Sequence, residues 1–153
     1  MFQADQLDRR ILRILQKRAD LSQAALAEQV GSSPASCWRR IKVMEAEGIL
    51  GPTVRILDPR ALGKNLDAVC QVRMKAHDRD SRASFEAFVE QQEEVLECLS
   101  MSGEWDYQLR ITVSNVGEYE EFLMRRLLSH PSVATSATHF ALKRVKHTTA
   151  LSV

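Results

Sequence analysis

The chain has 153 residues, of which 44% are hydrophobic and 27% are charged. This length allows one domain of average size or two small ones, and the composition is ordinary for a globular protein. No apolar run approaches the roughly 20 residues that a membrane span needs. The N-terminal MFQADQLDRR lacks the apolar stretch of a secretory signal peptide. The sequence therefore predicts a cytoplasmic protein without a membrane partner.

The formal net charge of +1 is divided unevenly along the chain. Residues 1–60 carry ten Lys/Arg against seven Asp/Glu, a net +3, whereas residues 61–153 carry eleven against thirteen, a net −2. This asymmetry indicates two modules with different partners. The three cysteines are widely spaced, without a CxxC pair or a His/Cys cluster, so neither a metal site nor a disulfide framework is expected.

Three helices are predicted within the first fifty residues. In residues 5–19, apolar side chains recur at the i, i+4, i+7 spacing of one helical face. A second helix begins after an N-cap at Ser22 and ends at Gly31. A third has Ser33 as its N-cap and ends at Gly48.

Two short helices joined by a glycine-containing turn, the second rich in Ser and Arg near its start, are typical of a helix-turn-helix. Arginine reaches phosphates and guanine edges, while serine hydroxyls and helix N-terminal amides suit phosphate oxygens. A basic triplet on a helix is by itself usually a solvated face, but the helix order, caps and charge together favour DNA binding. The residues expected to contact double-stranded DNA are Ser33, Ser36, Arg39, Arg40 and Lys42.

Trp38 on the third helix has two interpretations. It either packs against the first helix or lies along the DNA backbone, and packing is favoured because amphipathic aromatics usually bury most of their area. After this helix, residues 49–59 form an apolar stretch that is broken by Gly51-Pro52 and resumes as a strand. A turn and strand directly after a recognition helix predict a small wing.

The rest of the chain alternates between strand and helix patterns. Strands are predicted over residues 66–77, 94–101, 106–113 and 134–149, and helices over residues 81–92 and 118–130. The order β-α-β-β-α-β is that of a ferredoxin-like domain, one antiparallel sheet with two helices on one face. The predicted fold is therefore α+β, with a winged helix-turn-helix domain in residues 1–60 and a ferredoxin-like βαββαβ sandwich in residues 61–153.

The sheet face away from the helices is expected to be apolar and to need cover, because monomers rarely expose large apolar patches. No third helical layer is predicted, so a second copy of the chain is the expected cover. We therefore expect a homodimer formed by sheet-to-sheet packing.

No catalytic constellation is found in the sequence. The four histidines form no motif with a Ser, Cys or acid at nucleophile spacing, and neither a Gly-rich phosphate loop nor an HExxH pattern occurs. Glu104 with Asp106 would make an acid pair, but neighbouring carboxylates on a turn are usually solvated. We therefore expect no enzymatic activity, cofactor or metal, and a small ferredoxin-like enzyme with an accessory helical domain is the alternative from another class.

The two halves together resemble the Lrp/AsnC (feast/famine) family of prokaryotic transcription regulators over nearly the whole chain. The resemblance is carried by LDRRILRILQ, LAEQVGSSPASCWRRIKVMEAEGIL, LDPRALG, EVLECLSMSGEWDYQLRITV and VKHTTAL. It implies a winged helix-turn-helix, an amino-acid-sensing αβ domain and four dimers assembled in a ring, an octamer. The chain departs from the family at Val43, where many members carry a basic residue.

The resemblance also implies an effector site. In the family, the glycine and aspartate of the loop after the second strand line a small-molecule pocket at the contact between dimers. Gly103 would leave its backbone amide open to a ligand carboxylate, and Asp106 would either pair with an α-ammonium or hold the loop by accepting amide hydrogen bonds. A regulator of this fold without a ligand is the alternative. The effector-binding residues implied are Gly103, Trp105, Asp106, Tyr107, Ser136 and Thr138.

Overall fold

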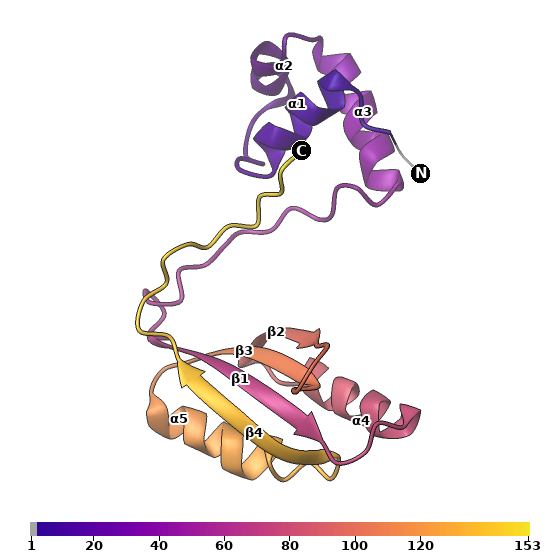
Figure 1. Cartoon of the computed structure of the whole chain (residues 1–153). Coiled ribbons are helices and arrows are strands. Elements are labelled where there is room, and N and C mark those ends of the chain that lie inside the picture. The colour runs from indigo at the N-terminus through magenta and orange to yellow at the C-terminus, as the bar shows by residue number, and fades with distance from the viewer. Residues whose placement is uncertain (1–2) are drawn as a thin grey trace. The chain divides into compact units, whose positions relative to one another are not determined.

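The computed structural model describes residues 3–153, which form two compact units. The helical unit consists of the chain up to Ile56 together with Lys146–Val153, and the sheet unit consists of Leu57–Val145 (Figure 1). All of residues 61–153 are predicted to form one domain. In the structure, the last eight residues instead group with the helical unit. None of the helices in the described part of the chain has the length and apolarity of a membrane span.

Three short helices build the helical unit: α1 (Gln6–Leu15), α2 (Gln23–Val30) and α3 (Pro34–Ala46). Each begins at a side chain that accepts hydrogen bonds from first-turn amides, namely Asp5, Ser22 and Ser33. Gly31 ends α2 with φ +66°, a left-handed conformation that glycine adopts without strain. These local signals explain why the three predicted helices are confirmed. Their shared core contains Ile11, Leu12, Leu26, Ala27, Val30, Cys37, Ile41 and Met44.

The wing strand predicted after α3 is not found among the described residues. Residues 51–58 run as an extended segment that pairs with no strand in the described part of the chain. The strand expected over residues 134–149 likewise ends at Phe140. The amide of Ala141 donates to the Asp67 carbonyl at 2.9 Å, and beyond it the neighbouring strand, which starts at Leu66, offers no further partner.

The sheet unit follows the predicted βαββαβ order. Its elements are β1 (Leu66–Met74), α4 (Arg79–Glu90), β2 (Val95–Ser100), β3 (Tyr107–Val113), α5 (Val116–Glu121) with its π-helical continuation η1 (Phe122–Leu127), and β4 (Val133–Phe140). The strands are antiparallel in the order β2-β3-β1-β4. The α+β class with a ferredoxin-like second domain is therefore confirmed.

One face of this sheet carries the core of the unit. Side chains alternate along each strand, and the buried set of β1 and β3 meets α4 and α5, which lie on the same face of the sheet (Figure 1). The largest helical contributions are Phe85 from α4 and Phe122 from η1, both fully buried. The strand residues that they cover are Ala68, Cys70, Val72, Met74, Tyr107, Leu109, Ile111 and Val113.

The opposite face is mostly polar, which corrects the expectation of an apolar face. Asp67, Gln71 and Arg73 of β1 alternate with its buried residues, and Gln108 pairs with Gln71 across the ladder. The Thr112 hydroxyl donates to the Asp67 carboxylate at 2.7 Å. Because most of these side chains are polar, this face does not by hydrophobic exposure alone require a partner.

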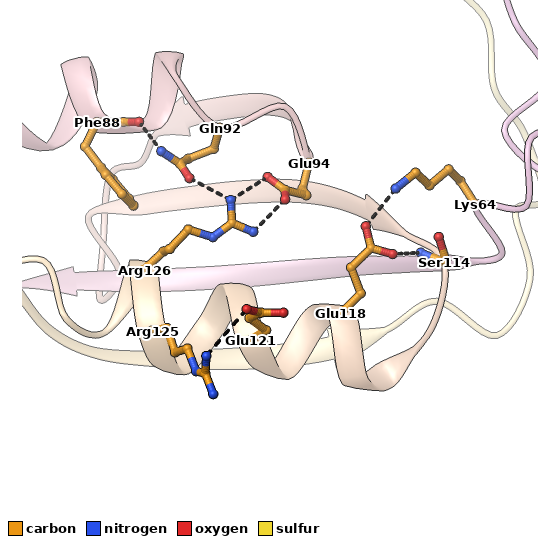
Figure 2. A network of polar contacts seen from close by, with 9 residues as sticks. All are labelled: Lys64, Phe88, Gln92, Glu94, Ser114, Glu118, Glu121, Arg125 and Arg126. Carbon is orange, nitrogen blue, oxygen red and sulfur yellow. Dashed lines mark hydrogen bonds and ion pairs between the residues drawn. The ribbon is translucent and has the colours of Figure 1, made fainter.

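Ion pairs hold the helices against the rest of the sheet unit. The guanidinium of Arg126 donates to both carboxylate oxygens of Glu94, at 2.5 and 3.1 Å, and to Gln92 at 3.2 Å (Figure 2). Lys64 donates to Glu118 at 2.7 Å, and the other oxygen of that carboxylate accepts from the Ser114 amide at 2.8 Å. The Glu118 carboxylate therefore has a cation on one oxygen and a backbone amide on the other.

Candidate DNA interface and effector turn

The predicted DNA-contacting residues of α3 and its N-cap differ in their exposure and in their hydrogen-bond partners. Ser33 is exposed, and its hydroxyl oxygen accepts from the Ser36 amide at 3.2 Å. Arg39 is exposed and makes no ion pair within residues 3–153. Lys42 is exposed but pairs with Glu45 at 2.7 Å. The exposed face of the helix therefore presents Arg39 as an unengaged guanidinium.

Arg40 is engaged inside the helical unit. Its Nη1 donates to Asp5 at 2.7 Å and to Asp8 at 2.8 Å, and it is thereby connected to the capping box of α1. The Asp8 side chain is only 8% exposed, so its carboxylate depends on this partner. Asp5 and Asp8 form a recognisable capping pattern in the sequence, but nothing local indicates that Arg40 lies beside them. A DNA contact by Arg40 stays a prediction.

Trp38 does not pack against the first helix, and the favoured interpretation of this residue is wrong. Its side chain is 55% exposed, and it is absent from the buried core of the helical unit. Val43, one helical turn beyond Arg39, is 47% exposed. The solvent face of α3 therefore combines a cation with apolar surface, a composition suited to a nucleic acid groove.

The turn between β2 and β3 is the candidate effector site. It is closed by the Met101 amide, which donates to the Asp106 carbonyl at 2.8 Å. Gly103 has φ +116°, and a Cβ added there would meet no atom within 4 Å. The amides of residues 102–105 make no hydrogen bond within residues 3–153. The turn therefore presents a group of free N–H donors.

Asp106 holds the turn to its neighbours. Its carboxylate accepts from the Met74 amide and from Nε2 of His77, each at 2.8 Å. Burial raises the pKa of Asp106, but these two hydrogen bonds together with the nearby charges of His77 and Arg82 outweigh it, and the pKa lies below its ordinary value. Of the two roles considered for Asp106, this geometry supports holding the loop. No sequence signal connects it with His77, because the two lie on different segments.

Trp105 lies against an arginine that the sequence did not single out. The guanidinium carbon of Arg73 is 5.0 Å from the centre of the indole, and its Nη2 donates to Glu104 at 2.7 Å. A cation over an aromatic face is attracted by the ring quadrupole. From the polar face of the sheet, Arg73 of β1 thus contacts two neighbouring side chains of the turn, Glu104 and Trp105.

The other implied effector residues do not gather at the turn within one chain. The ring of Tyr107 is buried against Phe85, and its hydroxyl donates to Glu86 at 2.7 Å. Ser136 pairs with Val72 in the β1–β4 ladder, whereas Tyr107 pairs with Val72 from the other side. Two strand spacings, roughly 10 Å, therefore separate them. Thr138 hydrogen-bonds with the hydroxyl of Tyr119.

The described residues contain no cluster of three or more His, Cys, Asp or Glu side chains suited to a metal ion. Cys37 and Cys70 are buried free thiols, and Cys98 is a half-buried one.

The fold and these two regions define a class of protein, namely a DNA-binding regulator with a separate ligand-binding domain. Residues 5–50 match the family model of a winged helix-turn-helix DNA-binding domain, and residues 67–151 match that of the Lrp/AsnC ligand-binding domain. The chain belongs to the Lrp/AsnC family of transcription regulators. Its fold class and its function as a DNA-binding regulator, both predicted from the sequence, are thereby confirmed.

Individual relatives agree with this assignment over most of their lengths. The DNA-binding transcriptional activator DecR of Escherichia coli is 36% identical over 97% of this chain and 98% of its own. The leucine-responsive regulatory protein of Salmonella typhimurium is 31% identical over 97% and 91%. A transcriptional regulator of Neisseria meningitidis, solved as an L-Met complex, superimposes with a TM-score of 0.94 at 35% identity, covering 98% of this chain and 97% of that chain.

Proposed function

We propose that this regulator reads specific DNA sequences through α3 and that its affinity for DNA changes when an amino acid binds at the turn Met101–Asp106. The observation that carries the effector assignment is the group of free amides at residues 102–105, next to a glycine with open space around it. Backbone N–H donors in a turn form a ready site for a carboxylate.

The surroundings of the turn favour an amino acid with an apolar side chain. Leu99 and Met101, at the end of β2 and the start of the turn, are 44% and 41% exposed, and the ring of Trp105 adds a further apolar surface. The regulator solved with L-Met is 35% identical to this chain. An amino acid with an apolar side chain would place its carboxylate on the turn amides and its side chain against these residues.

The DNA-contacting set that we propose is Ser33, Ser36, Arg39, Arg40 and Lys42, of which Arg40 is paired with Asp5 and Asp8 in the free protein. Arg39 is the unpaired cation of the set, so it is expected to make the strongest phosphate or guanine contact. We also propose that the protein works in the cytoplasm as a homodimer that assembles further, to an octamer, and that it has no catalytic role.

Thermal-shift screening of the natural amino acids tests the effector assignment. A true ligand raises Tm with concentration as RT ln(1 + [L]/Kd) predicts, and hits are repeated by titration calorimetry. DNA affinity is then measured by fluorescence anisotropy with and without the hit. If no amino acid raises Tm while DNA binding persists, the protein is a regulator of this fold without an amino-acid ligand.

The turn itself is tested by Trp105→Ala, which removes ring surface without altering the positive φ of Gly103. We expect amino-acid affinity to fall roughly tenfold, because an apolar contact of this size contributes about 1.5 kcal/mol. Val116→Ala on α5, also an exposed apolar side chain, is the matched control. Unchanged affinity in the Trp105 variant would show that the effector binds elsewhere.

A further inference from the structure

We propose that Trp38 contacts the sugar–phosphate backbone of bound DNA, with its indole N–H donating to a phosphate oxygen and its ring packing on deoxyribose. This inference rests on the proposed role of α3 as the DNA-reading helix and extends it to a residue outside the basic set. Three observations support it: the exposure of the side chain, its angular position on α3, and the charge of the surface around it.

A tryptophan exposed by 55% lacks the packing that such a side chain normally has. Within residues 3–153, none of the aromatic pairs or cation–π contacts involves Trp38. Burying even half of such a ring against another molecule would be favourable, because apolar area removed from water contributes to binding. More than half of this residue thus remains available to another molecule.

The position of Trp38 around α3 decides what it can reach. An α-helix turns by roughly 100° per residue, so Trp38 lies on one flank, between the buried Cys37 and the exposed Arg39. Arg40 lies on the opposite flank, where it is held by Asp5 and Asp8. With Arg39 directed into a groove, the flank of Trp38 faces the groove wall, where sugars and phosphates lie.

The chemistry of indole suits a phosphate wall. Its N–H is a donor without acceptor capacity, and much of protein–DNA hydrogen bonding goes to phosphate and sugar from neutral groups as well as from cations. The flat ring meets the apolar part of deoxyribose at the same time. Because the group is neutral, this contact displaces no counterion, in contrast to a phosphate contact made by Arg39.

The surface around Trp38 has the charge that DNA requires. The residues of the helical unit, 1–56 and 146–153, carry ten Lys/Arg against six Asp/Glu, a net +4. Glu45, on the same flank of α3 as Trp38, is paired with Lys42. A polyanion is therefore the occupant that this flank favours over a second copy of the same positively charged unit.

The test compares Trp38→Ala, Trp38→Phe and Arg39→Ala in the full chain. Binding is measured by anisotropy to a labelled duplex of mixed sequence, about 30 base pairs or three helical turns long, over a range of salt concentrations. A backbone contact must operate on any sequence, so no operator is needed. Val116→Ala again serves as the control for loss of an exposed apolar side chain, and thermal unfolding confirms that each variant is folded.

We expect Trp38→Ala to weaken binding roughly three- to tenfold at every salt concentration. The slope of log K against log salt should stay unchanged, whereas Arg39→Ala should flatten it by about one. Trp38→Phe, which keeps a ring but loses the N–H, should lie between wild type and alanine. The difference in emission between wild type and Trp38→Phe isolates Trp38, since Trp105 is the other tryptophan, and this emission should become protected from acrylamide when the duplex is added.

The outcomes separate DNA reading by α3 from the backbone contact of Trp38. If the wild-type protein binds no duplex, the proposed role of α3 in reading DNA is wrong. If wild type binds and Arg39→Ala flattens the salt slope, but Trp38→Ala binds equally well and its emission stays accessible, Trp38 makes no backbone contact. A Trp38→Ala protein that binds normally but has a smaller mass by light scattering would assign the ring to contact between copies of the chain, and would overturn the proposal.

Discussion

Two neighbouring arginines on α3 are chemically alike but have different surroundings. Arg39 is exposed and unpaired, whereas Arg40 carries two carboxylates on one guanidinium nitrogen and is 27% exposed. Removing Arg40 would leave the buried carboxylate of Asp8 without its cation. The loss of the cation beside a buried carboxylate is costly, while the loss of an exposed arginine is close to neutral.

This difference predicts that two alanine substitutions change the stability of the helical unit by different amounts. Arg40→Ala should lower the free energy of unfolding of the helical unit by about 1–2 kcal/mol, because Asp8 loses a charge-assisted hydrogen bond. Arg39→Ala, the matched control, should leave it within about 0.5 kcal/mol. Chemical denaturation followed by circular dichroism measures both. Equal stabilities of the two variants would mean that the contact of Arg40 with Asp8 does not stabilise α1 against α3.

The Glu118 carboxylate makes the stability of the sheet unit depend on pH. Hydrogen bonds from Lys64 and Ser114 lower its pKa from the ordinary 4.5 to about 2. A carboxyl whose pKa is lowered on folding stabilises the protein above its unfolded pKa, and this contribution is lost as pH falls through the folded pKa. The stabilisation by Glu118 is thus complete above about pH 4.5 and disappears on acidification toward about pH 2.

Glu118→Gln tests this pH dependence, because the amide keeps the shape of the side chain but cannot titrate. The variant should be less stable than wild type at pH 7, and the two unfolding midpoints should converge as pH is lowered from about 4.5 to 2. Glu121→Gln, on the same helix with an exposed 3.7 Å pair to Arg125, is the control. A constant difference between Glu118→Gln and wild type over this range would contradict the prediction.

At the scale of elements, the last eight residues behave as part of the helical unit. The side-chain amide of Gln16 donates to the Leu151 carbonyl at 2.9 Å and accepts from the Leu151 amide at 2.7 Å. Arg13 donates to the Val153 carbonyl at 2.6 Å. Val153 also packs against the apolar core of the three helices. The sheet and helical units are consequently joined by two chain segments, one at Ile56–Leu57 and one at Val145–Lys146.

Gln16→Ala should release this segment, because one side chain supplies both hydrogen bonds to Leu151. The expected loss is about 1–2 kcal/mol for docking of the segment, and trypsin cleavage after Lys146 should become faster. Lys17→Ala, which changes an exposed neighbour, serves as the control. Mass spectrometry of the digest identifies the cut, and an unchanged cleavage rate would show that Gln16 does not hold the segment.

At the scale of the molecule, apolar surface remains exposed on the edge strand of the sheet and in the extended segment before β1. Leu96 and Leu99 are exposed on the edge strand β2, and Val54, Ile56 and Leu57 are exposed in the extended segment before β1. Edge strands and unpaired extended segments present free backbone groups that favour association. These exposed apolar side chains and unpaired backbone groups now support assembly of the chain with other copies.

Multi-angle light scattering should therefore give a mass above the 17.3 kDa of one chain, with eight copies as the expected assembly. Leu99→Lys places a charge on the exposed side of β2 and should lower the mass, because a charged edge resists strand pairing. Leu62→Lys is the control, as it charges an exposed apolar position outside the sheet. A monomeric wild-type protein at micromolar concentration would contradict the assembly.

The helices and strands, and with them the family, were determined by the sequence itself. Ser22 and Ser33 cap helices and Gly31 ends one because capping and left-handed backbone geometry involve only a few neighbouring residues. The alternation in β1 and β3 likewise records which side chains face the core. The position of the turn between the second and third strands of the sheet unit was predicted correctly for the same reason.

Side-chain partners were decided only by the tertiary structure. Arg40 with Asp8, Asp106 with His77, and Gln16 with Leu151 are pairs that no local pattern connects, because each depends on which elements pack together. The same holds for strand ends: the alternation after Phe140 continues in the sequence, but a strand exists only where a neighbour supplies hydrogen bonds. Periodicity is a local property of the chain, whereas burial and pairing are properties of the packed molecule.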